Sequence, residues 1–110
     1  MDFHDIVKTL YARKLLRKYK HNKTWIRIYT EFVIKDGKKC DLYFENIKTK
    51  ESYVVEFQKE DSKQWENDIV EFYKDFIPAG MNTMDLVIVR LKKLSKNLDE
   101  LNNQLDEYIF

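Results

Sequence analysis

The sequence has little glycine, proline or cysteine, and each shortage excludes a class of protein. Two glycines and one proline in 110 residues are too few for a collagen-like or low-complexity chain. The 44% hydrophobic and 15% aromatic content also excludes an intrinsically disordered chain. The composition therefore predicts one domain over residues 1–110, long enough to bury a hydrophobic core of its own.

A single cysteine, Cys40, cannot form an intramolecular disulfide, and with two separated histidines it gives no zinc-site spacing. The N-terminus lacks a basic stretch followed by an apolar run, and no segment approaches the roughly 18 apolar residues of a membrane span. We therefore expect an intracellular, cytoplasmic protein that does not bind membranes. Plentiful Lys, Ile, Tyr and Asn beside few Ala and Gly suggest an AT-rich genome, such as that of a virus or mobile element. A viral protein would act in the host cytoplasm.

The formal net charge of +1 conceals an uneven distribution. Eight basic residues and no acidic residue lie between Ile6 and Thr30, whereas only acidic charges follow Asn97. Clustered Lys and Arg gain affinity for nucleic acid by releasing counterions, which predicts a DNA-facing surface, and a solvated helix face is the alternative. The residues that we assign to DNA contact are Lys8, Arg13, Lys14, Arg17, Lys18, Lys20 and Lys23.

Hydrophobic periodicity predicts the order helix, three strands, helix, strand. Apolar residues at helical spacing indicate helices over about 2–20 and 62–76. A tight turn at Asp36-Gly37 joins the first two strands, because this dipeptide accepts the positive φ angles of a hairpin. Alternating or continuous apolar runs place the strands at 24–34, 39–46, 52–58 and 84–91. The first three strands would form an antiparallel meander.

The last strand and the C-terminal segment complete the predicted fold. The apolar run 84–91 is typical of a strand that is buried on both faces and parallel to its neighbour. Leucines at steps of three and four then run from Leu91 to Leu105, and Asn97 with Glu100 resembles a helix N-cap pair. We expect this segment to pack on the sheet, and a dimer seam is the alternative. The fold class is α/β of the α+β type, with a mixed four-stranded sheet and a C-terminal helix.

Two carboxylates fall at one end of this predicted sheet. Asp41 opens the second strand, Glu56 lies near the end of the third, and Gln58 shares the face of Glu56. A hairpin would bring the carboxylates together as hard oxygen ligands of the kind that Mg²⁺ (or Mn²⁺) prefers. Such a metal polarises a phosphodiester and activates water, and Gln58 could orient that water. The alternative is the solvated polar face of a half-exposed sheet.

The segments KCDLYF around Asp41 and YVVEFQ around Glu56, in this order of elements, resemble the PD-(D/E)XK nuclease superfamily over about residues 2–90. The resemblance implies a restriction endonuclease-like α-β-β-β-α-β core. It also implies that Asp41, Glu56 and the backbone carbonyl of Phe57 hold the metal. Gln58 would stand where the superfamily has its lysine.

The sequence departs from the superfamily pattern at two positions. Cys40 replaces the proline before the aspartate, and Gln58 replaces the lysine. The second change matters more, because a neutral amide cannot stabilise charge on the phosphate as an ammonium does. An acidic or polar group on the first helix often assists in this superfamily. The local candidates for an assisting group are His4 and Asp5 on the first helix and Glu31 on the first strand.

These observations predict a metal-dependent DNA endonuclease, with Asp41, Glu56, Gln58 and Glu31 as its catalytic residues. A homodimer is expected, because one chain offers one active centre and two DNA strands need two cuts. Archaeal Holliday junction resolvases are small members of the superfamily, so the resemblance is consistent with a structure-selective resolvase. The alternatives are a non-catalytic nucleic-acid-binding module with a degenerate nuclease fold, and a protein-interaction factor that uses the C-terminal leucines.

Overall fold

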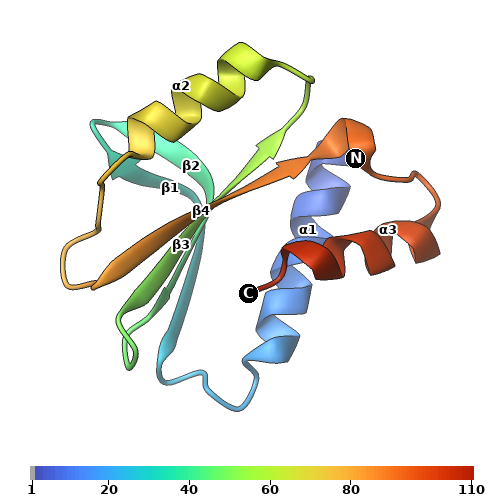
Figure 1. Cartoon of the computed structure of the whole chain (residues 1–110). Coiled ribbons are helices and arrows are strands. Elements are labelled where there is room, and N and C mark those ends of the chain that lie inside the picture. Colours follow the sequence, from blue (N-terminus) through green and yellow to red (C-terminus); the bar gives the residue numbers. More distant parts are fainter. Residues whose placement is uncertain (1) are drawn as a thin grey trace.

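The computed structural model describes residues 2–110 and shows an α+β fold (Figure 1). Its elements are α1 (Phe3–Lys18), β1 (Ile26–Lys35), β2 (Lys38–Asn46), β3 (Glu51–Gln58), α2 (Lys63–Tyr73), β4 (Thr83–Arg90), the 3₁₀ helix η1 (Leu91–Lys93), α3 (Leu98–Leu105) and the 3₁₀ helix η2 (Asp106–Tyr108). The strands form one sheet in the order β1-β2-β3-β4, antiparallel except for the parallel pair β3 and β4. The predicted order of elements and the mixed sheet are confirmed. None of the helices described in residues 2–110 is long and apolar enough to cross a membrane.

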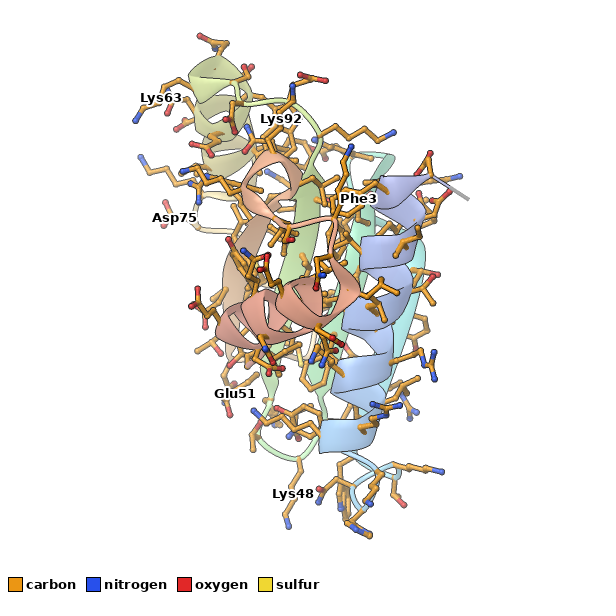
Figure 2. The ribbon with its side chains drawn as sticks, turned by 90° about the vertical axis from the view of Figure 1, so that its right-hand side faces the viewer. Phe3, Lys48, Glu51, Lys63, Asp75 and Lys92 are labelled. Atoms are coloured by element: carbon orange, nitrogen blue, oxygen red, sulfur yellow. The ribbon has the colours of Figure 1, made fainter. Side chains whose placement is uncertain are left out.

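The helices cover both faces of the sheet. Helices α1 and α3 lie on one face and α2 on the other (Figure 1). Figure 2 looks onto the first of these faces, where α3 lies beside α1. This arrangement divides the apolar side chains into a large core under α1 and α3 and a small core under α2.

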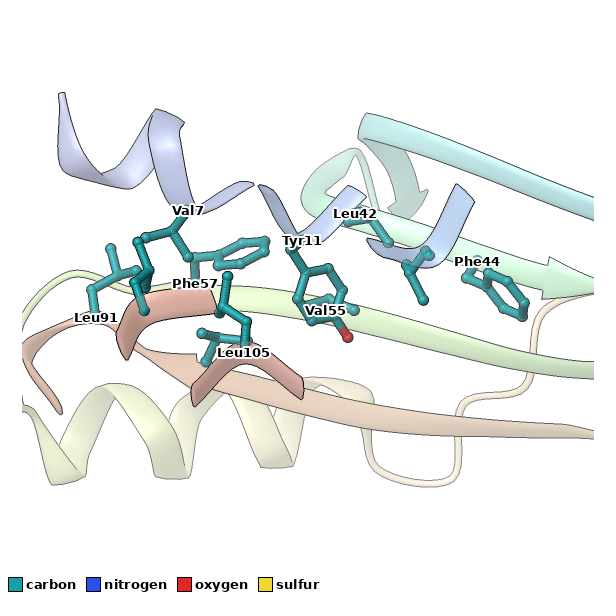
Figure 3. Close-up of a cluster of buried hydrophobic side chains, with 11 residues drawn as sticks. Val7, Tyr11, Leu42, Phe44, Val55, Phe57, Leu91 and Leu105 are labelled. Atoms are coloured by element: carbon teal, nitrogen blue, oxygen red, sulfur yellow. The ribbon is translucent and has the colours of Figure 1, made fainter. Parts of the chain in front are cut away.

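The large core holds α1 firmly against the sheet. Val7 and Tyr11 of α1 face Val55 and Phe57 of β3, as Figure 3 shows. The Tyr11 hydroxyl also donates a hydrogen bond of 2.8 Å to the backbone carbonyl of Tyr108. Each fully buried side chain of this kind stabilises the fold by about 1.5–3 kcal/mol. The packing therefore fixes the N-terminal half of α1 over the end of β3.

Local sequence explains where the hairpin turns and where α3 begins. Asp36 and Gly37 take φ angles of 50° and 75°, which confirms the predicted tight turn. The Asn97 side chain accepts hydrogen bonds from the backbone N–H groups of Asp99 and Glu100. This N-cap confirms the start of a helix after Asn97.

The C-terminal leucines pack on the sheet as predicted, with one exception. Leu101 and Leu105 are buried in the large core, whereas Leu98 is 65% exposed. The chain is extended at Leu94, between η1 and the Asn97 cap. Because one continuous helix does not run through this segment, the steps of three and four residues do not place every leucine on one face.

Strand β4 is parallel to β3 and packs on both cores as predicted, but its burial is incomplete. Only Val89 of β4 is fully buried, and Met84, Leu86 and Ile88 are half-buried. In the described sheet β4 is the last strand. An edge strand has a neighbour on one side only, so its apolar side chains keep part of their exposure.

The apolar side chains of β1 and β2 change face part-way along each strand, contrary to the predicted alternation. Ile28 packs on the large core and Phe32 on the small core, although the two residues share a parity. In β2, Leu42 belongs to the large core and Cys40 to the small core. The prediction that Cys40 and Leu42 share one apolar face is therefore wrong.

The change of face occurs where Glu31 and Asp41 lie opposite each other. Thr30 pairs with Leu42 and Phe32 pairs with Cys40, so these two acidic residues lie between the pairs. Glu31 has a φ of +50°, a left-handed conformation that interrupts the alternation of side chains along a strand. The distortion places two of the predicted site residues together at one point of the sheet.

Candidate active site

Asp41 and Glu56 meet where β2 and β3 separate. The regular pairing of the two strands ends at Leu42 and Val55. Beyond this point the Asp41 N–H donates to Glu56 Oε1 at 2.9 Å, and the Phe57 N–H donates to Asp41 Oδ2 at 2.8 Å. Each carboxylate thus takes a backbone N–H of the opposite strand, which holds the two side chains beside each other.

A cleft of about 620 Å³ opens at this end of the sheet. The four residues predicted to be catalytic, Asp41, Glu56, Gln58 and Glu31, all line it. They come from β1, β2 and β3, and Trp65 of α2 contributes part of the wall. The cleft is also lined by His4, Lys38, Lys39, Phe57, Lys59 and Ser62. The tertiary structure therefore gathers the predicted site residues in one place.

Burial changes the acidity of Glu56. Its side chain is only 5% exposed, and this burial raises the pKa of the carboxyl to about 7, although the Asp41 N–H acts in the opposite direction. The negative charge of Asp41 adds to the increase. Among residues 2–110, no basic side chain forms an ion pair with Glu56. A cation that binds beside Glu56 would therefore not have to displace an ion pair.

Asp41 is approached by two basic side chains of α1. His4 Nε2 lies 4.0 Å from Asp41 Oδ2, and Lys8 Nζ lies 3.8 Å from Asp41 Oδ1. Lys8 also donates a hydrogen bond to Glu31. Lys8, one of the residues predicted to contact DNA, therefore lies beside two acidic residues that line the cleft. The spacing of four residues between His4 and Lys8, which places both on one side of a helix, is the sequence pattern that indicates this.

The two assisting candidates on α1 differ in position. His4 lines the cleft, whereas Asp5 does not and is exposed to solvent. Oxygen and nitrogen atoms of Asp2, His4 and Asp5 lie within 4.8 Å of one another. The Asp2 carboxylate accepts the Asp5 N–H at 3.0 Å as the N-cap of α1, and this bond lowers the pKa of Asp2. Helix capping accounts for this group.

Gln58 is buried at the end of β3. Its Nε2 donates to the backbone carbonyl of Ser62 at 3.1 Å, and its Oε1 has no hydrogen-bond partner among the described residues. A buried oxygen without a partner costs about 1–3 kcal/mol. The side chain is thus held by one end, and the oxygen at its other end is an unpaired acceptor.

The predicted DNA-facing residues do not form one group. Lys8 contacts Glu31 and Asp41 beside the cleft, and Lys14 is only 14% exposed and forms an ion pair of 2.7 Å with Asp106. The remaining five residues are exposed on α1 and on the segment that follows it. These exposed residues are Arg13, Arg17, Lys18, Lys20 and Lys23.

The donor atoms in the cleft fit a divalent cation such as Mg²⁺. Asp41 and Glu56 each use one oxygen to accept a backbone N–H, and the second oxygen of each accepts no hydrogen bond within residues 2–110. Two carboxylate oxygens close together are the ligands that Mg²⁺ prefers. A cation at this place would also stabilise the charged form of Glu56, which burial disfavours. Phe57 lines the cleft beside them. A role for its carbonyl as a third ligand stays a prediction.

Comparisons with protein-family models, curated proteins and solved structures find no match for this chain. The resemblance to the PD-(D/E)XK superfamily therefore stays a prediction. It depends on Asp41, Glu56 and the order of the elements around them.

Proposed function

We propose that this protein is a metal-dependent nuclease that hydrolyses DNA phosphodiester bonds in the cleft between the ends of β2 and β3. One observation carries the proposal: reciprocal hydrogen bonds hold the carboxylates of Asp41 and Glu56 beside each other where the strands separate. The order of elements around them, which the PD-(D/E)XK resemblance implies, supports it.

The two carboxylates would hold Mg²⁺ or Mn²⁺, which supplies positive charge to the phosphate and lowers the pKa of a water molecule. The Phe57 N–H keeps Asp41 in place for this role. Glu56 must lose its proton before it binds a cation, and its pKa is about 7. We therefore expect the site to bind metal more tightly as the pH rises through 7.

The reaction needs water as its only co-reactant. The water oxygen forms a bond to phosphorus while the bond from phosphorus to one ester oxygen breaks. The water loses a proton and the leaving oxygen gains one, so the products are a terminal phosphate and a hydroxyl. The free Oε1 of Gln58 would accept a hydrogen bond from the attacking water and orient it.

DNA would be held by the five exposed basic residues on and after α1. Contacts between basic side chains and phosphates position a duplex without reading its sequence, which suits a nuclease that recognises the shape of a four-way junction. Helix α1 has 16 residues and is about 24 Å long. A homodimer would provide the two active centres that cleavage of both strands requires.

The proposal is tested by a cleavage assay on supercoiled plasmid, linear duplex, single-stranded and four-way-junction DNA. Each substrate is incubated with Mg²⁺, Mn²⁺ or EDTA. Wild type should cut at least one substrate only when metal is present, and Glu56→Gln should not cut. Glu51→Gln is the matched control, because Glu51 is an exposed glutamate of the same strand. Cleavage in EDTA, or equal cleavage by Glu56→Gln, would contradict the proposal.

A non-catalytic nucleic-acid-binding module is the second candidate, and Gln58 is the observation that favours it. A neutral amide at this position supplies no charge to a phosphate. This candidate predicts salt-sensitive DNA binding without cleavage. The third candidate, a protein-interaction factor, needs the C-terminal leucines at the surface, and Leu101 and Leu105 are buried.

A further inference from the structure

We propose that Lys8 supplies the ammonium group that position 58 lacks, so that the phosphate is contacted from α1 instead of from β3. This inference rests on the proposed nuclease function. It adds to that function the residue that stabilises the negative charge on the phosphate during hydrolysis.

Lys8 lies at the border of the cleft, where its backbone and the tip of its side chain are both held in place. At its backbone, the neighbouring Val7 is fully buried in the large core. At its tip, Nζ lies 3.8 Å from Asp41 Oδ1 and donates a hydrogen bond to Glu31. The side chain is 14% exposed. Both ends are therefore fixed, and the ammonium stays next to the carboxylate that would bind the metal.

The lysines that line the cleft are less suited to this role. Lys38, Lys39 and Lys59 line the cleft, but none forms an ion pair with an acidic residue of the cleft in the part of the chain that the structure describes. Lys39 and Lys59 are exposed, and Lys38 Nζ lies 4.9 Å from the centre of the Phe72 ring. Lys8 is the lysine that contacts Asp41.

The chemistry of phosphate hydrolysis requires such a charge. Negative charge spreads over the phosphate oxygens in the transition state, and a fixed cation beside them lowers the barrier. Gln58 is neutral, so it cannot act in this way. A phosphate that binds beside Asp41 would meet the Lys8 ammonium, which Glu31 keeps in position.

The same geometry makes a second prediction that does not involve cleavage. In the protein without metal, the Lys8 ammonium balances the charges of Asp41 and Glu31. A divalent cation at Asp41 and Glu56 would be repelled by this ammonium at short range. Removal of the Lys8 charge should therefore tighten metal binding even as it slows cleavage, and a merely structural role for Lys8 does not predict this combination.

The experiment compares Lys8→Met with Lys14→Met in the full chain. Lys14 is a matched control because it lies on the same helix, is equally exposed at 14% and forms an ion pair with Asp106. Plasmid cleavage is measured with Mg²⁺, and Mn²⁺ affinity is measured from the electron paramagnetic resonance signal of the free ion. Lys8→Met should cleave about 100-fold more slowly or worse and should bind Mn²⁺ about tenfold more tightly. Lys14→Met should change neither by more than about twofold.

Two further variants separate loss of charge from loss of folding. Lys8→Arg keeps the positive charge, so it should fold and keep cleavage within about tenfold of wild type. Lys8→Met combined with Gln58→Lys returns an ammonium to the cleft from β3, and it should cleave at least about tenfold faster than Lys8→Met alone. Thermal unfolding curves confirm that each variant is folded.

The outcomes distinguish this inference from the function on which it rests. If wild type cuts DNA and Lys8→Met cuts as fast, the inference is wrong and the nuclease proposal stands. If Lys38→Met loses cleavage and Lys8→Met does not, the ammonium comes from Lys38. Slower cleavage by Lys8→Met with unchanged Mn²⁺ affinity and no recovery through Gln58→Lys would give Lys8 a structural role only. If wild type cuts no substrate with any metal, the proposed function and this inference both fail.

Discussion

At both ends of the β2–β3 hairpin, side chains accept hydrogen bonds from backbone N–H groups, but the two ends use different kinds of side chain. At the turn end, Asn46 pairs with Glu51 in the ladder, and Asn46 Oδ1 accepts the backbone N–H groups of Lys48 and Thr49, each at 3.0 Å. Lys48 and Glu51 lie at this end in Figure 2, opposite the end where Phe3 and Lys92 lie. A neutral side chain at the protein surface completes the backbone hydrogen bonds here.

At the cleft end, charged side chains complete them. Asp41 and Glu56 accept backbone N–H groups from opposite strands, and Glu56 is buried. Burial of a carboxyl disfavours its charged form, and this effect raises the pKa of Glu56 to about 7. A neutral amide such as Asn46 makes the same kind of bond without this cost. The acids at the cleft end therefore carry a cost that the amide at the turn end does not.

The largest expected effect is on cleavage by Asp41→Asn. The asparagine still accepts the Phe57 N–H but lacks the charge that holds a cation, so we expect cleavage to fall by at least about 1000-fold while DNA binding changes little. Glu51→Gln makes a similar change at the turn end and should cleave at the wild-type rate. Initial rates on plasmid DNA measure both variants. If Asp41→Asn and Glu51→Gln lose cleavage equally, the cleft end of the hairpin has no special role in cleavage.

The next effect is the pH dependence of stability without metal. Glu56 has a pKa of about 7 in the folded protein, above its ordinary value of 4.5. The folded protein thus holds a proton that the unfolded chain has lost, and stability falls as the pH rises from about 4.5 to 7. Glu56→Gln does not titrate. We expect it to be more stable than wild type at pH 8 by on the order of 1–3 kcal/mol, with a smaller difference at pH 4.

Urea unfolding in EDTA at pH 4, 6 and 8 measures this difference between Glu56→Gln and wild type. Glu51→Gln provides the control at the turn end, because its exposed carboxylate should give the same free energy of unfolding as wild type at each pH. If the difference in the free energy of unfolding between Glu56→Gln and wild type does not grow with pH, the pKa of Glu56 is not raised by burial.

A third prediction concerns the exposed bases that would bring DNA to the cleft end. Arg13→Glu combined with Arg17→Glu should weaken DNA binding about tenfold or more and lower the slope of log affinity against log salt by about two. Lys63→Glu combined with Lys74→Glu makes an equal charge change at the first residue and the C-cap of α2, on the opposite face of the sheet, and should have a smaller effect. Fluorescence anisotropy at several salt concentrations measures both pairs. If Arg13→Glu combined with Arg17→Glu binds DNA as tightly as wild type, α1 is not the DNA-binding surface.

The smallest expected effect is at the turn end. Asn46→Ala removes the acceptor of two backbone N–H groups that solvent can then hydrate, so we expect a loss of about 1 kcal/mol in the free energy of unfolding. Cleavage should not change. A loss of cleavage in this variant would mean that the turn end also contributes to the active site.

Much of the fold follows from local sequence. The order of elements, the Asp36-Gly37 turn and the Asn97 cap were all predictable, because hydrophobic period and turn chemistry act over a few residues. The separation of Asp41 and Glu56 along the chain also indicates that a hairpin brings them together. These features need no knowledge of what packs on the sheet.

The change of face at Glu31 was not predictable in the same way. Strict alternation places Cys40 and Leu42 on one side, but the two residues lie in different cores, next to the left-handed Glu31 of the paired strand. Leu98 is exposed for a related reason, since the break before Asn97 decides which leucines face the core. Such interruptions depend on how two segments fit together and not on either segment alone.

Residue type and spacing are enough to predict the elements, their order and the two carboxylates that hairpin geometry brings to one end of the sheet. The packed fold brings Lys8 of α1 beside Asp41 and buries Glu56 enough to raise its pKa to about 7. Both depend on the packing of α1 and α2 against the sheet. Contacts between segments far apart in the chain set charge and burial, and neither can be read from local spacing.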